Sequence, residues 1–233
     1  MHLKKLIIVP AHNEQANLKR TIQEIQQLTD DYHVLVIDDG SSDTSAEEAR
    51  ACGVEVVSLV FNLGIGGAVQ TGLCYALENG FDVVIRIDAD GQHDPASIKA
   101  LLEPLMNKDA DMAIGSRFLE SLPTFQPGPM RLCGIHFLAG LISTLTGMKI
   151  TDPTSGFCAW NTRAMTRFAE EYPIDFPEPE SIVTAVRSGL KIREVPVRMR
   201  HRQAGVSSIH HLMSIYYMVK VTCAILIRMM SAV

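Results

Sequence analysis

The sequence lacks the usual marks of a nucleic-acid-binding, secreted or disulfide-rich protein. Its 233 residues carry a formal net charge of −5, which argues against nucleic-acid binding through bulk electrostatics. The five cysteines are odd in number and widely spaced, so we expect reduced core residues rather than a disulfide framework or a zinc site. Residues 1–10 lead directly into a strand pattern without the long apolar region of a signal peptide. One main cytosolic domain is therefore expected.

Two common nucleotide-binding motifs are also missing. Pro10–Glu14 follows the first apolar run, at the place where a dinucleotide-binding protein has G-x-G-x-x-G. Gly64, Gly66 and Gly67 come later and lack the Lys-Ser/Thr pair of a P-loop. A nucleotidyltransferase would need a glycine-rich loop with Arg or Lys after the first strand, and Pro10–Glu14 is not such a loop. These absences argue against an NAD- or ATP-dependent enzyme and against a nucleotidyltransferase.

Strand patterns alternate with helical patterns through the first half of the chain. We expect strands at residues 6–9, 34–37, 54–59, 81–87 and 112–114, and helices at 18–28, 44–52, 68–78 and 95–106. No internal repeat or low-complexity tract interrupts this order. The alternation predicts an α/β fold with a mostly parallel central sheet flanked by helices.

The most informative stretch follows the fourth strand. Asp88, Asp90 and Gln92 bring several hard oxygen atoms to the carboxyl end of a buried strand, where open α/β sheets bind ligands. Such a donor set suits Mg²⁺ or Mn²⁺ holding a diphosphate. The alternative is an Asp-rich turn, and for Asp94-Pro95 we favour a helix start with Asp at the N-cap and Pro at the first helical position.

Further carboxylates and amides occur where other strands are expected to end. They are Asn13 and Glu14, Asp38 and Asp39, and Asn62. Each could be ordinary turn chemistry, but together they could hydrogen-bond a ribose, a base edge and a sugar.

The motifs in this order resemble those of family 2 glycosyltransferases, and most closely those of dolichyl- or polyprenyl-phosphate sugar transferases and their bacterial cell-wall relatives. The resemblance rests on IVPAHNE at residues 8–14, VIDDGSSD at 36–43, NLG at 62–64, DADGQH at 88–93 and GSR at 115–117. It implies a GT-A fold over residues 1–208, a nucleotide-sugar donor, a divalent metal and transfer with inversion. A non-catalytic sugar-nucleotide-binding module is a further alternative.

The resemblance also assigns roles to individual residues. The donor would be bound by Pro10, Ala11, Asn13, Glu14, Asp38, Asp39, Asn62, Asp88 and Ala89. Asp90 and Gln92 would ligate Mg²⁺ or Mn²⁺, which stabilises the departing UDP or GDP. Arg202 and Ser207, in a segment that matches R-x-x-G-x-S, would close over the phosphates; the less favoured alternative for Arg202 is a solvated surface arginine.

On the acceptor side, the resemblance implies that Arg117 and Arg131 bind a polyprenyl phosphate and that Asp152 shapes the entrance. A hydrogen-bonded turn with Gly156 in an unusual conformation is the other interpretation of the Asp152 segment. If the acceptor is instead a hydroxyl of a cell-wall or capsule saccharide, Glu178 or Glu180 could act as the base. These two glutamates could also be residues of a first helical turn.

Two apolar stretches bear on membrane binding. The stretch after Arg131 is broken by Gly134 and Gly140, so we expect it to lie on a membrane or to pack on the sheet. Residues 209–233 are expected to form an apolar C-terminal helix interrupted by Lys220 and Arg228 on one basic face. A membrane-interfacial position is favoured over an oligomer interface. We therefore expect a protein on the cytoplasmic membrane face, attached peripherally or through a membrane-protein partner.

Overall fold

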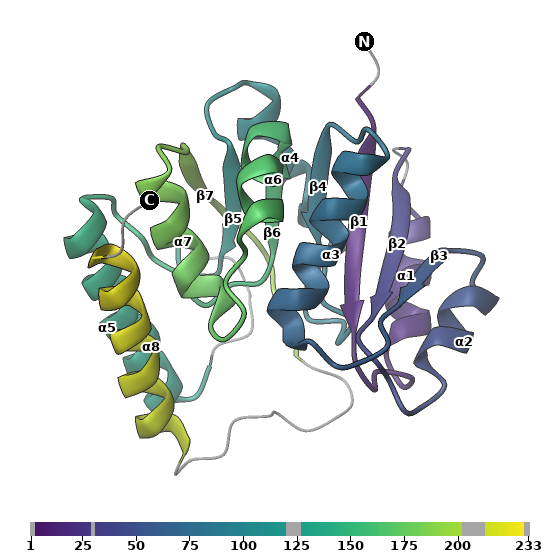
Figure 1. Cartoon of the computed structure of the whole chain (residues 1–233), viewed down its shortest axis with the longest axis horizontal. Coiled ribbons are helices and arrows are strands. Elements are labelled where there is room, and N and C mark those ends of the chain that lie inside the picture. The colour runs from purple at the N-terminus through teal and green to yellow at the C-terminus, as the bar shows by residue number, and fades with distance from the viewer. Residues whose placement is uncertain (1–2, 29–30, 120–126, 202–212, 231–233) are drawn as a thin grey trace.

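The computed structural model describes residues 3–28, 31–119, 127–201 and 213–230, which form one sheet with helices on both faces (Figure 1). The described strands form a seven-stranded sheet in the order β3-β2-β1-β4-β6-β5-β7. They are β1 Lys5–Ala11, β2 His33–Asp38, β3 Glu55–Ser58, β4 Val83–Arg86, β5 Met112–Ser116, β6 Cys158–Asn161 and β7 Ile192–Pro196. Only β6 among them runs antiparallel to its neighbours. The predicted parallel α/β architecture is confirmed.

Successive residues of the strands point alternately into two separate hydrophobic cores, one on each face of the sheet. Ile7, Val9 and Ile85 point to one face, which is covered by α1 Leu18–Gln26, α2 Ser45–Ala51 and α4 Ile98–Met106. Leu6, Ile8 and Val84 point to the other face, which is covered by α3 Gly64–Glu78, α5 Pro129–Thr146, α6 Thr162–Glu170, α7 Pro177–Arg187 and α8 Met213–Met230. Because both faces are covered, the central strands are mostly apolar.

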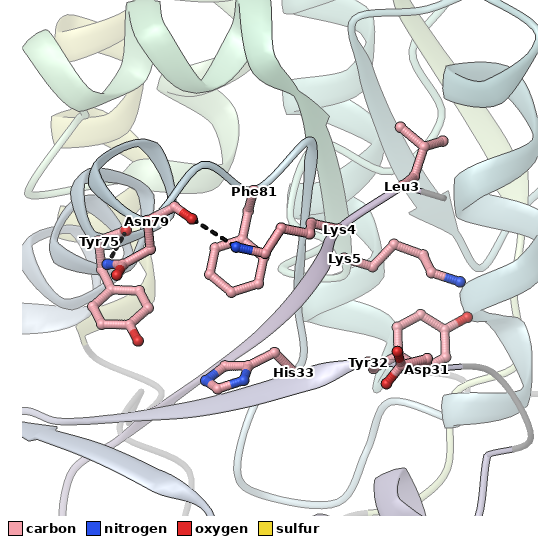
Figure 2. A pocket seen from close by; sticks show the side chains of 9 residues that line it. All are labelled: Leu3, Lys4, Lys5, Asp31, Tyr32, His33, Tyr75, Asn79 and Phe81. Carbon is pink, nitrogen blue, oxygen red and sulfur yellow. Dashed lines mark hydrogen bonds between the residues drawn. The ribbon is translucent and has the colours of Figure 1, made fainter. Parts of the chain in front are cut away.

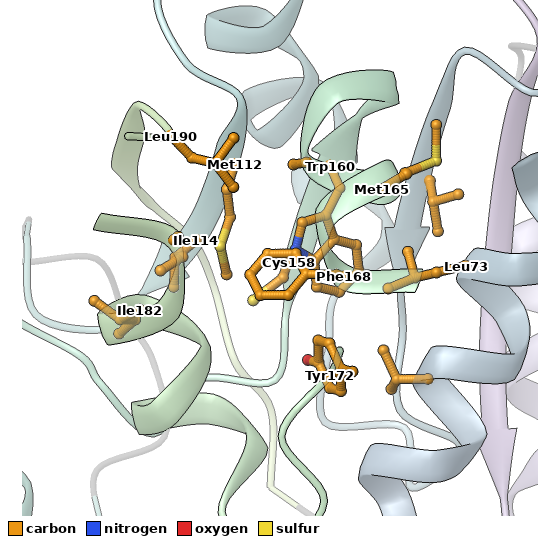
Figure 3. Close-up of a cluster of buried hydrophobic side chains, with 14 of the residues drawn as sticks. Leu73, Met112, Ile114, Cys158, Trp160, Met165, Phe168, Tyr172, Ile182 and Leu190 are labelled. Atoms are coloured by element: carbon orange, nitrogen blue, oxygen red, sulfur yellow. The ribbon is translucent and has the colours of Figure 1, made fainter. Parts of the chain in front are cut away.

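The centre of the second core is aromatic (Figure 3). Trp160, Phe168 and Tyr172 meet edge to face, with ring centroids 5.4 to 6.5 Å apart. Such arrangements favour the contact of a positive ring edge with a negative ring face. They pack the C-terminal half of α6 and the following Tyr172 against β6.

Some element boundaries differ from the sequence expectation. The third helix begins at Gly64 rather than at residue 68, because the Asn62 side chain accepts the Gly64 N–H at 2.9 Å. Gly66 also allows the first turn of α3 to pack closely against the backbone of Pro173, since a methyl group at residue 66 would lie 2.3 Å from the Pro173 carbonyl oxygen. Helix α5 runs unbroken through Gly134 and Gly140 because Ile135, Leu138 and Ile142 bury its inner face.

The C-terminal helix α8 is part of the fold and not an appended segment. Val221 and Ile225 are fully buried in the second core, where α8 packs beside α5 and α7 (Figure 1). Within the described residues, no helix combines the length and apolar character needed to cross a bilayer. The prediction that all five cysteines are core residues is wrong for Cys133 and Cys223, which are exposed on α5 and α8.

Candidate functional site

The predicted site residues gather at the carboxyl edge of the sheet, around the junction of β1 and β4. From β1 the chain adds β2 and β3 on one side and then returns to β4 on the other. Ligands of open α/β proteins bind at such a point, because the loops from the two directions separate there. Ala11 ends β1, Asp38 ends β2 and Asp88 follows β4, so these three lie on the same edge.

The first two loops are tied together by side-chain bonds. Asn13, with a left-handed φ of 54°, accepts the Ser42 N–H at 2.9 Å. Asp38 accepts the Ser41 N–H at 3.1 Å, and Asp39 accepts the Leu63 N–H at 2.7 Å. Asp39 therefore anchors the loop that carries Asn62. These bonds preorganise the edge of the sheet, and they also account for part of the polar composition as turn chemistry.

The Asp88–Gln92 loop is held from several directions. Thr21 of α1 donates to the Ala89 carbonyl at 3.1 Å, and the Gln92 N–H donates to Asp90 Oδ1 at 3.0 Å. The Gln92 amide nitrogen donates to the Arg200 carbonyl at 3.3 Å. The amide oxygen of Gln92 therefore points away from Arg200. The loop thus offers a carboxylate and an amide oxygen.

That donor set fits a divalent ion that shares its coordination with a ligand. The part of the chain that the structure describes has no group of three or more His, Cys, Asp and Glu side chains able to hold a metal ion. Mg²⁺ is usually held by one or two carboxylates together with substrate phosphates and water. Asp90 and Gln92 match this pattern.

His93 supports the same loop from beneath. Its Nδ1 accepts the Asp88 N–H at 3.1 Å, and its ring stacks on Phe157 with centroids 4.7 Å apart. Burial lowers the pKa of His93, so the ring is neutral at pH 7. Since Nδ1 is the acceptor, the proton is assigned to Nε2.

Arg117 and Asp152 meet in a buried bidentate pair. Arg117 Nε and Nη2 each donate to one Asp152 oxygen at 2.6 Å, and Nη2 also donates to Thr154 at 2.8 Å. Asp152 is fully buried, and Glu194 of β7 accepts its backbone N–H at 2.8 Å. In this arrangement Arg117 orders the Asp152 segment, so binding an acceptor phosphate would require its guanidinium to exchange partners.

Both proposed bases lie inside the first turn of α7, next to arginines. Glu178 Oε1 is 3.0 Å from Arg86 Nη1, and Glu180 Oε2 is 3.6 Å from Arg228 Nε. Burial raises the pKa of Glu180, against the lowering effect of Arg228. Arg86 was not anticipated from the sequence, although a charged residue inside the apolar run of residues 83–87 was the available signal.

The remaining predicted residues are Arg131, Arg202, Ser207 and the basic pair Lys220 and Arg228. Arg131 is exposed near the start of α5, so its acceptor role stays a prediction. Arg202 and Ser207 lie outside the described residues. Arg228 does not share a basic face with Lys220, because eight residues turn a helix about 80° beyond two full turns. Its guanidinium turns inward to Glu171 and Glu180.

The opposite end of the sheet carries a hollow of about 380 Å³, lined by residues at the start of β1 and β2 (Figure 2). Its polar groups are used within the fold. Lys4 donates to the Asn79 carbonyl at 2.9 Å and lies over the Phe81 ring, while Tyr75 donates to Glu55 at 2.7 Å. The predicted site residues lie at the other edge, so we assign this hollow no role in their chemistry.

Comparison with known proteins agrees with this geometry. Residues 6–172 match the family model described as glycosyl transferase family 2, and the chain belongs to that family. It is 30% identical to the polyprenol monophosphomannose synthase of Mycolicibacterium smegmatis, over 88% of this chain and 80% of the relative. It is also 30% identical to the UDP-N-acetylglucosamine–dolichyl-phosphate N-acetylglucosaminyltransferase of Methanococcus voltae, over 82% and 84% of the two chains.

A solved structure supports the fold. The glucosyl-3-phosphoglycerate synthase of Mycobacterium tuberculosis, in complex with Mn²⁺, UDP and glucosyl-3-phosphoglycerate, superposes with a TM-score of 0.72 at 22% identity. The match covers 99% of this chain and 81% of the other. The protein is therefore a glycosyltransferase with a GT-A-like α/β fold.

Proposed function

We propose that this protein transfers one sugar from a UDP- or GDP-sugar to a polyprenyl or dolichyl phosphate, with inversion and with a divalent metal. The observation that carries the proposal is the position of Asp88 and Asp90 at the β1/β4 junction, beside the Asp38 and Asp39 loop. Two relatives at 30% identity are named for transfer to polyprenol or dolichyl phosphate. A UDP donor and Mn²⁺ are consistent with the names of the relative and the solved structure.

The surroundings of Glu178 and Glu180 favour a phosphate acceptor. A phosphate oxygen is already ionised at pH 7 and needs no general base, whereas a saccharide hydroxyl does. Both glutamates face arginines at 3.0 and 3.6 Å, so each has a place as the counter-ion of an arginine. The alternative is transfer to a saccharide hydroxyl, and the raised pKa of the buried Glu180 is the feature that favours it.

In the proposed reaction, an acceptor phosphate oxygen attacks the anomeric carbon from the face opposite the diphosphate. The bond between that carbon and the β-phosphate oxygen breaks, and the nucleoside diphosphate leaves with the electron pair. Asp90 and Gln92 would hold the Mg²⁺ or Mn²⁺ ion, which when bound stabilises the negative charge of the leaving group. Asp38 and Asp39 would orient the nucleoside, and Arg131 would bind the acceptor phosphate.

A lipid acceptor also requires access to a membrane, and we propose that the outer surface of α5 and α8 provides it. Met130 and Phe137 on α5 and Tyr216 and Val219 on α8 are 53 to 61% exposed. Neither helix contains an acidic residue, and the exposed Arg131 and Lys220 add positive charge. An apolar surface with cationic and no acidic side chains fits the interface of an anionic bilayer. The protein would then act peripherally, on the cytoplasmic membrane face.

Donor binding tests the first part of the proposal. We expect one UDP- or GDP-sugar in a calorimetric panel to bind with Mn²⁺ or Mg²⁺ and to lose at least about tenfold in affinity in chelator. Asp90→Asn should reproduce that loss while keeping the wild-type melting temperature. Asp109→Asn is the matched control, because Asp109 is exposed in the turn between α4 and β5, at the opposite edge of the sheet. Metal-independent binding by Asp90→Asn would contradict the assignment.

A further inference from the structure

Arg86 is a buried charge at the carboxyl end of β4. It is 3% exposed and follows the apolar residues Val83, Val84 and Ile85. A buried guanidinium is costly unless it is paired, and Arg86 is paired twice. Its Nε donates to Asp88 Oδ1 at 2.7 Å, and its Nη1 lies 3.0 Å from Glu178 Oε1.

The charge state of this cluster is clear from its contacts. Burial alone would lower the pKa of Arg86, but the carboxylates of Asp88 and Glu178 raise it well above its ordinary value. The guanidinium is therefore charged at every accessible pH. It joins the loop after β4 to the first turn of α7, two segments that are 90 residues apart in the chain (178 − 88).

The residues around the Arg86–Asp88 ion pair pack closely against it. A methyl group on Gly156 would lie 2.7 Å from Arg86 Nη2 and 2.8 Å from Asp88 Oδ2. Gly156 does not have a positive φ, so close approach to the ion pair, and not an unusual backbone conformation, is what requires glycine here. On the other side, His93 accepts the Asp88 N–H at 3.1 Å. The Asp88 side chain is nevertheless 29% exposed and so can still meet a ligand.

We propose that Arg86 is a positioning residue for the donor: it orients the Asp88 carboxylate and couples the metal-binding loop to α7, with Glu178 as its counter-ion and not as a general base. The inference rests on the proposed function. Asp88 is oriented by a charged donor that cannot be deprotonated. A lysine could not replace it fully, because one ammonium cannot reproduce contacts made by two separate guanidinium nitrogens.

Removing Arg86 should have two separate effects, one on the stability of the fold and one on donor binding. In Arg86→Met, the partly buried Glu178, whose side chain is 19% exposed, is left without its partner, which destabilises the fold, and Asp88 loses its orientation, which weakens donor binding. Adding Glu178→Gln removes the unpaired charge but does not restore the orientation of Asp88. A purely structural role predicts that both properties recover together.

The experiment compares wild type, Arg86→Met, Arg86→Lys, Glu178→Gln and the Arg86→Met/Glu178→Gln double variant. Melting temperature reports stability, and calorimetry with UDP or GDP and Mn²⁺ reports binding. We expect Arg86→Met to lower the melting temperature and to weaken nucleotide binding roughly 10- to 100-fold. The double variant should recover most of the melting temperature and little of the binding, and Arg86→Lys should recover part of the binding.

Four outcomes would overturn or redirect the inference. Recovery of binding together with stability in the double variant would show that Arg86 acts only on the fold. A flattened pH profile of sugar transfer in Glu178→Gln, with a loss of turnover of more than about 100-fold, would show that Glu178 is a base. If wild type binds neither UDP nor GDP, the proposed function fails and the inference fails with it, whereas normal binding by Arg86→Met overturns the inference alone.

Discussion

At the scale of single residues, Asp111 shows how one carboxylate joins three elements. Its Oδ2 accepts the Lys191 N–H at 2.8 Å, and its Oδ1 accepts from the Asn161 amide at 3.0 Å. Burial raises the pKa of Asp111, but these bonds and the Arg163 guanidinium outweigh it, so the net shift is downward. The Arg163 side chain is 58% exposed, so solvent screens its contribution to the lowered pKa of Asp111.

We predict that Asp111→Asn lowers the free energy of unfolding by about 2 kcal/mol at pH 7. The folded-state pKa of Asp111 lies below its unfolded value of about 4. The stabilisation is therefore fully present above pH 5 and is lost as the pH falls through the folded-state pKa. Urea unfolding of wild type and variant between pH 3 and pH 7 measures the difference. A difference that stays constant down to pH 3 would contradict the assigned cause.

Local chemistry at the site could be predicted from the sequence, but partners could not. Asp94 was predicted as a helix cap, and its side chain does accept the Ala96 N–H. The carboxylates of Asp88 and Asp90 were predicted to end a buried strand, which they do. The Arg86 to Glu178 pair escaped prediction because no local pattern reports which residues meet when they are 92 positions apart (178 − 86). Arg117 was likewise predicted at a strand end without its buried partner Asp152.

At the scale of elements, α8 has two different faces. Its inner face carries Val221 and Ile225 in the core and Arg228 next to Glu171 and Glu180. Its outer face carries a stripe of exposed residues at helical spacing, Tyr216, Val219 and Cys223. The inner face fixes the helix on α5 and α7, and the outer face is open for another contact.

We predict that Val219→Glu and Phe137→Glu each weaken binding to vesicles of phosphatidylcholine and phosphatidylglycerol by roughly tenfold, because a carboxylate is repelled by anionic lipid and resists leaving water. Both side chains are more than half exposed, so the melting temperature should stay within about 2 °C of wild type. Met106→Glu, on the 50% exposed residue that ends α4, is the matched control. Vesicle co-sedimentation measures binding.

If wild type does not bind these vesicles, the membrane proposal is wrong. If instead the wild-type protein forms a dimer that both variants disrupt, the outer surface of α5 and α8 is an oligomer interface. Analytical ultracentrifugation of the same proteins distinguishes this outcome.

The alternating strands and helices of the first half were predictable, whereas strand β6 and the course of α5 were not. The parallel strands and the intervening helices of the first half lie near their expected positions because each is an uninterrupted pattern. Strand β6, Cys158–Asn161, escaped prediction because its antiparallel place in the sheet depends on pairing with β4 and β5, which are distant from it in the sequence. Helix α5 continues through Gly134 and Gly140, because burial of its inner face outweighs their low helix propensity.

At the scale of the whole molecule, the two proposed tasks, donor binding and lipid contact, fall on different parts of the fold. The carboxyl edge gathers the residues proposed to hold the donor, and the two cores above and below the sheet make that edge rigid. The surface of α5 and α8 proposed to meet the membrane lies to one side of this arrangement (Figure 1). Proposed donor binding and lipid contact are thus on separate elements. Helix α7 joins them, because its Glu178 pairs with Arg86 and its Glu180 pairs with Arg228.

The measurement that tests this account most directly is sugar transfer to a short-chain polyprenyl phosphate compared with the matched polyprenol, using the donor that binds and Mn²⁺. We predict labelled product with the phosphate only, a turnover reduced at least about 100-fold in Asp90→Asn, and a pH profile that Glu180→Gln leaves similar in shape. Transfer to a saccharide hydroxyl or to the polyprenol, with none to the polyprenyl phosphate, would contradict the account and would favour Glu180 as a base.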